Sequence, residues 1–379
     1  MMMASRILPF LILTSLLRGE SPSPKSIQAA IDQGVQFLET TQAENGSWGD
    51  EAYPAITALP ITAIMRNPQR PTQEVPSAAN LGYQFLLANQ QEDGGIYQDG
   101  LATYNTSLAL KAFSFHPTAR TNLQTPVRAA RQFLIKQQAD FGEQGTLDSP
   151  FDGGVGYGGT YTHSDLSNTH FVLESLVYSR KVVEDTGTPE PFQLDWDAAI
   201  SFVSRCQNRE ESNDLPSLHV RPEDQGGFVY FPGNSKAGQT QVGEKKVALR
   251  SYGSMSYAGL LSFIYADLDP SDPRMVSVLT WLKANYTLEE NPHMEAQGLY
   301  YYYHTLSKAL SLAGLPILTL ADQSEVAWKE ELASRLLSLQ KPDGSWINDA
   351  SSRWWENDPA LVTSYALLAL ANILVPPAL

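Results

Sequence analysis

The chain has 379 residues, of which 42% are hydrophobic and 18% are charged, a balance typical of an ordered protein and not of a disordered one. Its formal net charge is −15, and its Lys and Arg residues form no cluster that would neutralise phosphates. These features argue against a nucleic acid as partner. The single cysteine, Cys206, excludes an intramolecular disulfide and a zinc site built from several thiolates.

The N-terminal 25 residues differ in character from the rest of the chain. Arg6 precedes an apolar run over residues 7–17, and the turn-rich segment Ser21-Pro22-Ser23-Pro24 follows. As a helix this run would extend about 16 Å, which is too short to cross a bilayer core of about 30 Å. A charged, an apolar and a polar region in this order are typical of a secretory signal. We therefore expect residues 1–25 to be a signal peptide, the protein to be exported to the periplasm or the medium, and the chain to have no transmembrane span.

Residues 26–379 repeat one pattern, in which two helices are joined by a turn. Apolar residues at helical spacing over 27–38 lead into the turn Gln42–Trp48, and a second apolar segment begins at Pro54. The same order recurs at Gln90–Ile96, before a helix over 104–115, and at Gln340–Trp346, before a helix over 360–373. In each copy Gly follows Gln by four residues, and a large apolar residue follows Gly by two. Three matches in one register indicate an internal repeat.

Three weaker copies of the turn lie in the middle of the chain. They contain Gly153-Gly154, Gly226-Gly227 and Gln297-Gly298, and they precede helices expected over 165–178, 252–266 and 301–312. Glycine can adopt the positive φ that ends a first helix, and a Gln amide can satisfy free backbone groups of the turn. The large apolar residue would then cover the junction. We therefore expect six helical hairpins in a single domain over residues 26–379.

This register resembles the QW-type repeat of squalene and oxidosqualene cyclases and of the β subunits of protein prenyltransferases. The whole chain looks most similar to bacterial prenyltransferase/squalene oxidase repeat proteins, notably in Ser251–Met255, Tyr300–His304 and Trp354–Leu361. The resemblance implies an all-α fold, an (α/α)6 toroid with six inner helices around a central cavity and six outer helices behind them. Because one fold serves several functions, the reaction has to be judged from the residues.

The residues that carry catalysis in these families are mostly missing. A squalene-type cyclase protonates an alkene with an aspartic acid of a DxDD-like motif, and the nearest segment here, Asp267–Asp272, stands among prolines in a turn. The prenyltransferases bind zinc through an Asp, a Cys and a His. Arg250 and Tyr252 occupy the first two of these positions, and His304 alone matches the third. One ligand does not hold zinc, so we expect neither a metal nor another cofactor.

Polar and aromatic residues instead gather at the starts of the second helices, which would converge on the mouth of the cavity. The predicted catalytic residues are Asp165, His170, His304 and Asp358. The predicted ligand-binding residues are Asn168, Arg250, Tyr252, Tyr257, Tyr301, Tyr303, Trp354 and Trp355. Helix capping would explain Asp165, Asn168 and Asp358 equally well. His163 lies seven residues before His170, so the two could share a helix face.

Three functions remain open from the sequence. The first is binding or transformation of a small apolar or isoprenoid-like ligand, since aromatic rings suit apolar chains and cationic intermediates. The second is a non-catalytic scaffold that binds a protein partner through the inserted loops 139–164, 208–248 and 286–298. The third is a polysaccharide-active enzyme whose acid and base would come from Asp165, Glu174, Glu356 and Asp358.

Overall fold

The computed structural model describes residues 21–158, 163–184, 190–216, 218–244 and 246–379. The predicted signal peptide thus falls largely outside the described residues, whereas Pro24 and Lys25, which were assigned to it, already belong to the first helix. The α-helices are α1 (Pro24–Thr41), α2 (Pro54–Met65), α3 (Ser77–Ala88), α4 (Ala102–Ser114), α5 (Ala119–Asn122), α6 (Gln124–Ile135), α7 (Leu166–Val183), α8 (Trp196–Arg205), α9 (Gly253–Tyr265), α10 (Pro273–Ala284), α11 (Leu299–Leu312), α12 (Trp328–Leu339) and α13 (Pro359–Leu374). Two short antiparallel hairpins pair β1 (Gln239–Val242) with β2 (Lys246–Leu249) and β3 (Leu318–Thr319) with β4 (Glu325–Val326). Short 3-10 turns cover Pro222–Asp224 and Arg353–Trp355.

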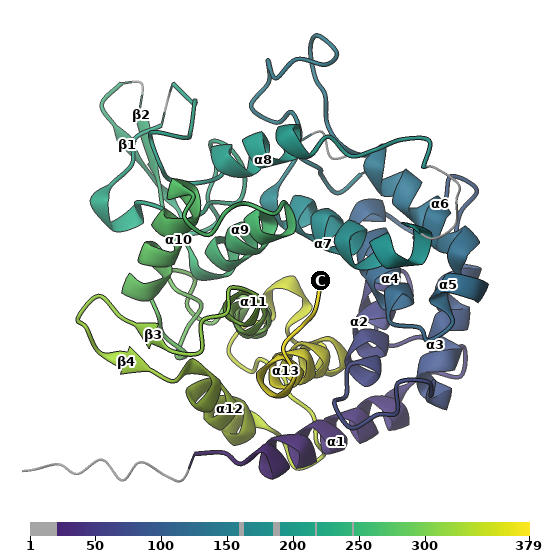
Figure 1. The fold of residues 1–379 in the computed structure, drawn as a ribbon. Coiled ribbons are helices and arrows are strands. Elements are labelled where there is room, and N and C mark those ends of the chain that lie inside the picture. Colours follow the sequence, from purple (N-terminus) through teal and green to yellow (C-terminus); the bar gives the residue numbers. More distant parts are fainter. Residues whose placement is uncertain (1–20, 159–162, 185–189, 217, 245) are drawn as a thin grey trace, which may run out of the picture.

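Six of these helices pack side by side in a closed ring (Figure 1). α2 contacts α4, α4 contacts α7, and the order continues through α9, α11 and α13 back to α2. These inner helices are apolar on most sides, and every residue of α2 is buried. A helix with this composition must be covered all round, which an inner position provides. The prediction of a helical fold is confirmed.

The helices outside the ring alternate with the inner ones along the chain. α1, α3, α6, α8, α10 and α12 each precede an inner helix and pack against one or two of them from outside. Their sequences are amphipathic. In α1 the buried side includes Ile27, Ile31 and Leu38, at the spacing of one helix face. The outer helices therefore cover the ring with one apolar face and expose the other to water.

The repeated glutamine ties each turn to the next outer helix. The Gln42 amide donates to the carbonyl of Gly46 in its own turn and to the carbonyl of Ala78 in α3, both at 2.9 Å. The same pair of bonds recurs for Gln90, Gln138, Gln207 and Gln340. The last of these reaches Ala30 in α1, so the bond joins the two ends of the ring. The expected role of the Gln amide is confirmed at these five turns.

The glycine and the apolar residue of each turn are fixed by equally regular contacts. Gly153 has a φ of +82°, and a Cβ at this position would lie 2.0 Å from the carbonyl oxygen of Ala198 in α8. Trp48 is buried; its indole donates to the carbonyl of Leu38, and its backbone amide donates to the hydroxyl of Thr57 on the inner helix. A glycine is therefore needed where the turn touches the neighbouring outer helix.

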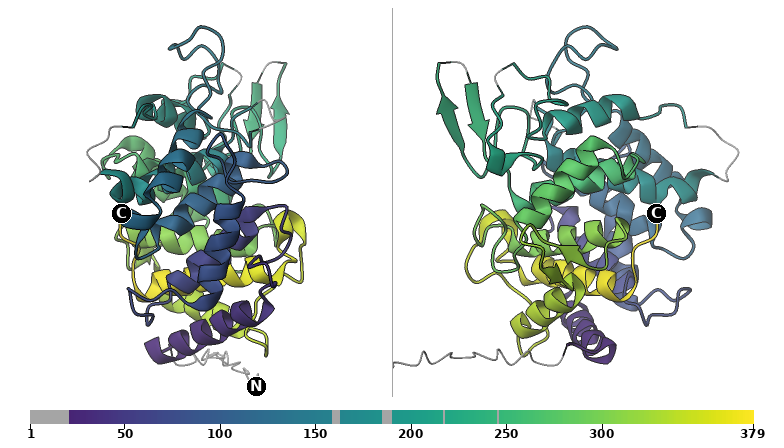
Figure 2. Two further views of the ribbon diagram at one scale, coloured as in Figure 1. Left: turned by 90° about the vertical axis from the view of Figure 1, so that its right-hand side faces the viewer. Right: turned by 60° about the vertical axis from the view of Figure 1, so that its left-hand side comes forward.

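Segments that belong neither to the inner and outer helices nor to the repeated turns lie at the ends and one edge of the ring. The hairpin β1–β2 and its flanking loops lie near α8 and α10 (Figure 1) and project from the edge of the molecule (Figure 2). After α13, residues 375–379 cross the end of the ring formed by the C-termini of the inner helices (Figure 1). There Arg66 donates to the carbonyl of Val375, and Lys181 of α7 donates to the carbonyl of Leu379. Among the described residues, no helix is long and apolar enough to cross a membrane.

Candidate functional site

Side chains that join non-neighbouring inner helices define the interior of the ring. The carboxylate of Glu174 on α7 pairs with the ammonium of Lys111 on α4 at 2.7 Å and with that of Lys308 on α11. Since α9 lies between α7 and α11 in the ring, the pair with Lys308 must cross the interior. All three side chains are at most 5% exposed. With His170 and His304 they form what we call the interior cluster.

Helical spacing brings the interior cluster together. His170 and Glu174 are four residues apart on α7, and His304 and Lys308 are four residues apart on α11. Residues at this spacing lie one above the other on a single helix face. Tyr301 lies three residues before His304 and therefore continues the same face of α11. The helices α7 and α11 thus each place a histidine and a charged residue on the face that points into the ring.

The interior cluster contains more basic than acidic side chains. One carboxylate cannot neutralise two ammonium groups, and removing a charge from water is unfavourable unless it is paired. Burial accordingly lowers the pKa of Lys111 to about 7. Burial, with the nearby charges of Lys111 and Arg66, lowers the pKa of Lys308 well below its ordinary value. The Nζ of Lys308 also lies 4.6 Å from the centre of the Tyr178 ring and 5.5 Å from that of Tyr265.

The two histidines are neutral and have unused hydrogen-bonding capacity. Burial lowers the pKa of both; the charges of Lys308 and Lys111 add to the effect on His170, and that of Lys111 adds to the effect on His304. The ring of His170 stacks on Tyr265 at 5.8 Å, and that of His304 stacks on Tyr365 at 5.7 Å. Within the part of the chain that the structure describes, no protein group bonds to the Nδ1 of either histidine or to the hydroxyl of Tyr265. Buried polar atoms of this kind normally have a partner.

An aromatic band lies beside the interior cluster, toward the start of the inner helices. Phe171 of α7 contacts Tyr104 of α4 at 5.3 Å and Tyr301 of α11 at 6.0 Å between ring centres. Tyr301 in turn contacts Tyr365 of α13 at 5.8 Å. Such tilted and edge-on pairs are the favoured arrangements of aromatic rings. The interior therefore has an aromatic part formed by Tyr104, Phe171, Tyr301 and Tyr365 and a charged part formed by the interior cluster.

The carboxylates at the mouth of the ring cap helices. Asp165 is the N-cap of α7 and accepts from the backbone and side chain of Asn168, and Asp358 caps α13 through the amides of Ala360 and Leu361. Glu356 accepts from two backbone amides at the start of α11. Burial raises the pKa of Asp165 and that of Glu356 to about 7 each. The capping interpretation of Asp165 and Asp358 therefore agrees with their observed contacts.

Several predicted ligand-binding residues face away from the interior. The hydroxyl of Tyr303 donates to the carbonyl of Leu288, and Arg335 of α12 approaches it from outside. Tyr257 packs against Tyr302, which bonds to the loop outside the ring. Four consecutive tyrosines point around the whole helix, so the run places Tyr301 inside and the others in the packing layer.

Other predicted residues lie at the mouth or beyond it. Tyr252 is buried at the start of α9, where Tyr301 and Asp165 add to the burial that raises its pKa. Arg250 lies outside the ring, in a pocket of about 400 Å³ where it contacts His293 at 3.1 Å. His163 precedes α7 and packs on Phe231, so the expectation that it shares a helix face with His170 is wrong.

Two tryptophans mark the rim of the mouth in an unusual backbone conformation. Trp354 and Trp355 have φ values of 57° and 60°, in the left-handed region that non-glycine residues rarely adopt. Trp355 packs on Tyr53 at 4.9 Å, while Trp354 is 42% exposed and covers Gly298 at the start of α11. Strain of this kind persists only where the surroundings hold it. The pair therefore forms a fixed aromatic rim.

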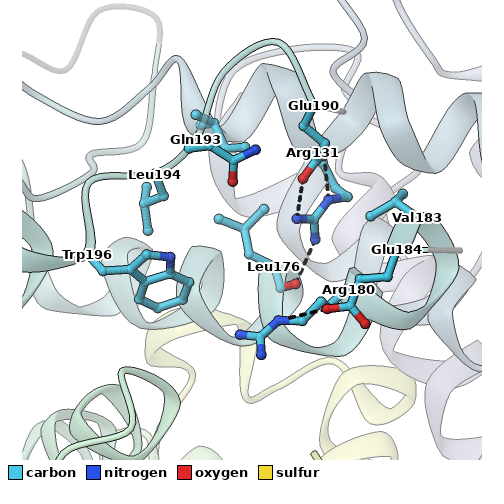
Figure 3. Close-up of a pocket in the computed structure, with 10 residues that line it drawn as sticks. Arg131, Leu176, Arg180, Val183, Glu184, Glu190, Gln193, Leu194 and Trp196 are labelled. Carbon is cyan, nitrogen blue, oxygen red and sulfur yellow. Dashed lines mark hydrogen bonds and ion pairs between the residues drawn. The ribbon is translucent and has the colours of Figure 1, made fainter. Parts of the chain in front are cut away.

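The pocket in Figure 3 lies outside the ring, against the outer face of α7 (Figure 3). It has a volume of about 360 Å³. Of its two arginines, Arg180 pairs with Glu184 at 3.8 Å, and Arg131 donates to both oxygens of Glu190, to the carbonyl of Leu176 and to the hydroxyl of Ser179. These bonds satisfy the guanidinium of Arg131, so it is not available to bind a ligand. The pocket is therefore a weaker candidate than the ring interior.

The sequence prediction missed Lys111 and Lys308 as site residues. A signal for both was present, because each is the only lysine or arginine in an otherwise apolar or neutral inner helix. Lysine is almost never fully buried unless it is paired. A lone lysine in such a segment thus points to a buried partner of opposite charge, here Glu174. Among the described residues, no three His, Cys, Asp or Glu side chains are grouped so that they could hold a metal ion.

Known proteins match this chain by fold. No family model and no curated protein matches the sequence. The type II terpene cyclase MstE from Scytonema superposes with a TM-score of 0.55 at 12% identity, covering 93% of this chain and 99% of that one. The GH76A α-1,6-mannanase from Salegentibacter gives 0.54 at 9% identity, covering 92% and 99%. A possible member of the GH105 family from Salmonella enterica gives 0.55 at 10%, covering 97% and 99%. The chain shares the α/α-toroid fold with these enzymes, and the likeness at such identities concerns the fold alone.

Proposed function

We propose that the ring interior binds an apolar, isoprenoid-like ligand that carries a polar head. The observation that supports this most directly is that three buried polar atoms of the interior have no protein partner among the described residues: Nδ1 of His170, Nδ1 of His304 and the hydroxyl of Tyr265. Leaving such groups unpaired destabilises a fold by about 1–3 kcal/mol each, so a bound molecule that pairs with them is strongly favoured.

The two parts of the interior fit the two ends of such a ligand. The aromatic band of Tyr104, Phe171, Tyr301 and Tyr365 offers ring faces and edges to an apolar chain. The interior cluster offers lysine ammonium groups and imidazole nitrogens to a polar head. A variant of the cyclase MstE binds geranylgeranyl dihydroxybenzoate, its substrate, which also joins an isoprenoid chain to a polar group.

The contacts of the carboxylates give no support to a polysaccharide-active site. A glycosidase needs two carboxyl groups on opposite sides of the scissile bond. Here Asp165, Glu356 and Asp358 accept from backbone amides of three different helices, and Glu174 is engaged by two lysines. Each carboxylate thus has a separate partner.

Farnesol, an isoprenoid alcohol, provides the test. Isothermal titration of the purified full chain should give one binding event, and His304→Leu should weaken it about tenfold, because one buried hydrogen bond is lost. His219→Leu, in the loop outside the ring, is the matched control and should bind as the unaltered protein does. Farnesol that fails to bind, or that binds equally well to His304→Leu, would refute the proposal and favour a scaffold role.

We further propose that the architecture is an (α/α)6 toroid of six hairpins, forming one domain over residues 26–379 of an exported protein. The closed order of inner-helix contacts supports the hairpin count. The charged, apolar and polar pattern of residues 1–25 supports export. Mass spectrometry of the protein recovered from the periplasm or medium tests the proposed export. The expected product lacks the N-terminal segment, and full-length protein confined to the cytoplasm would contradict export.

A further inference from the structure

Two lysines share one carboxylate in the interior of the ring, and this is chemically unusual. The ammonium of Lys111 and that of Lys308 both contact the carboxylate of Glu174, and none of the three side chains is more than 5% exposed. If both lysines kept their protons, the buried group would carry a net positive charge. Desolvation disfavours such a charge strongly, so the pair gives up a proton more readily than an isolated surface lysine.

We propose that the pair Lys111–Lys308, held by Glu174, supplies a free amine that captures an aldehyde or ketone group as an imine. This inference rests on the proposed function, because the carbonyl would belong to the polar head of the bound ligand. It narrows the ligand class to apolar carbonyl compounds.

The surroundings suit this chemistry in two ways. Desolvated lysines next to another cationic group are the ones that act as imine-forming nucleophiles. The faces of Tyr178 and Tyr265 lie 4.6 Å and 5.5 Å from the Nζ of Lys308 and would attract the positive charge of a protonated imine as they attract an ammonium. The carboxylate of Glu174 remains beside the nitrogen as its counter-ion.

A pocket at one end of the ring comes close to the interior cluster. A pocket of about 310 Å³ lies between α4, α7 and residues 378–379 and is lined by Phe115 and Tyr178. The ring of Tyr178 is also the nearer aromatic contact of the Lys308 ammonium. A rotation of this one side chain would therefore connect the pocket with the interior cluster.

The reaction balances without an oxidant or a reductant. The amine nitrogen of one lysine forms a bond to the carbonyl carbon, and the carbonyl oxygen takes up a proton to give a carbinolamine. The ammonium of the second lysine donates a proton to the hydroxyl group, which leaves as water. The nitrogen lone pair closes the C=N bond and gives the protonated imine, and the neutral imine forms when the remaining proton on nitrogen returns to the second lysine. The two amine hydrogens and the carbonyl oxygen thus leave as one water molecule.

Trapping with farnesal, the aldehyde that corresponds to farnesol, tests the inference. The full chain is incubated at pH 7 with farnesal and sodium cyanoborohydride, which reduces an imine to a stable secondary amine. Peptide mapping by mass spectrometry then locates the adduct. We expect Lys111 or Lys308 to be labelled at least tenfold faster than the exposed Lys246, because at pH 7 an ordinary lysine holds only about one free amine in 2,500. Labelling of exposed lysines alone would overturn the inference.

Matched variants and a second aldehyde separate this inference from the proposed function. Arginine keeps the charge but does not form the imine, so Lys111→Arg/Lys308→Arg should lose the fast adduct while Lys283→Arg on outer helix α10 keeps it. Mapping of the unaltered chain remains decisive if the double variant does not fold. Farnesol binding without a farnesal adduct would overturn the inference and leave the proposed function standing. Acetaldehyde trapped on the pair without any farnesol binding would support the amine and refute the apolar ligand.

Discussion

The turns at the rim of the ring repeat one set of contacts, whereas the interior is built from contacts that occur once. Five glutamines make the same two hydrogen bonds, one within the turn and one to the next outer helix. In the interior, the charged residues Lys111, Glu174 and Lys308 lie on three of the inner helices, whereas α2, α9 and α13 contain no charged residue. The amide nitrogens of all five glutamines have partners, whereas Nδ1 of His170 and Nδ1 of His304 in the interior have none among the described residues. The repeated contacts thus build the fold, and the contacts that occur once form the candidate functional site.

The largest effect is expected at the rim, from Gly153→Ala. The substitution places a Cβ 2.0 Å from the Ala198 carbonyl and imposes a side chain on a φ of +82°. Backbone strain of about 1–2 kcal/mol and overpacking of about 1–3 kcal/mol should together lower the free energy of unfolding by about 4 kcal/mol, measured by urea denaturation. Gly233→Ala has a similar φ of +89° and open space around it, so it should show the strain alone. Equal losses in both variants would contradict the close-contact explanation.

In the interior, Glu174→Gln should destabilise the protein by about 3 kcal/mol, because it leaves buried lysines without their counter-charge. The exposed pair Arg180–Glu184 provides the control, and Glu184→Gln should change the free energy of unfolding by less than about 1 kcal/mol. Replacing all three charges at once, with Lys111→Met, Glu174→Leu and Lys308→Met, should restore most of the stability while abolishing ligand binding. A triple variant that still binds farnesol would show that the interior cluster is not needed for ligand binding.

The pH dependence of stability should identify the buried lysines. The pKa of Lys111 is about 7 in the folded protein and about 10.4 when unfolded, so the unfolded state binds more protons between these values. Stability relative to Lys111→Met should therefore rise with pH from about 7 to about 10, by about 1.4 kcal/mol per pH unit. Urea titrations at several pH values measure this difference. A difference that stays flat would show that Lys111 keeps an ordinary pKa, and one that falls with pH would show that its pKa is raised.

The smallest effect is expected from the repeated glutamine. Gln42→Ala removes two hydrogen bonds of 2.9 Å and should lower the unfolding free energy by about 1–2 kcal/mol. Gln36→Ala, on the exposed side of α1, should change it by less than about 0.5 kcal/mol. Farnesol affinity should be unaffected by either change. A loss of binding in Gln42→Ala would mean that the rim and the interior are not separate in function.

The repeat could be predicted from the sequence because its information is local. Gln, Gly and the large apolar residue stand within seven positions of one another, and each turn uses them in the same way. The second helices were predicted within a few residues of their observed bounds, since their apolar spacing and glycine turns are also local signals. The order of contacts around the ring followed from the resemblance.

The interior was predicted only in part, because its contacts join residues far apart in the sequence. His170, His304 and Tyr301 were singled out and do lie inside the ring. Glu174 was named only for an acid–base role, and Lys111 and Lys308 were not considered. Which tyrosine of the run 300–303 faces inward depends on the rotation of α11 in the ring, and the sequence alone does not fix that rotation.

A crystal structure of the protein purified from its native source would test the central claim most directly. The proposed function predicts electron density for a non-protein molecule that lies along Tyr301 and Tyr365 and reaches Nδ1 of His170 or His304. An interior in which these nitrogens bond only to protein groups, with no room for a ligand, would contradict it.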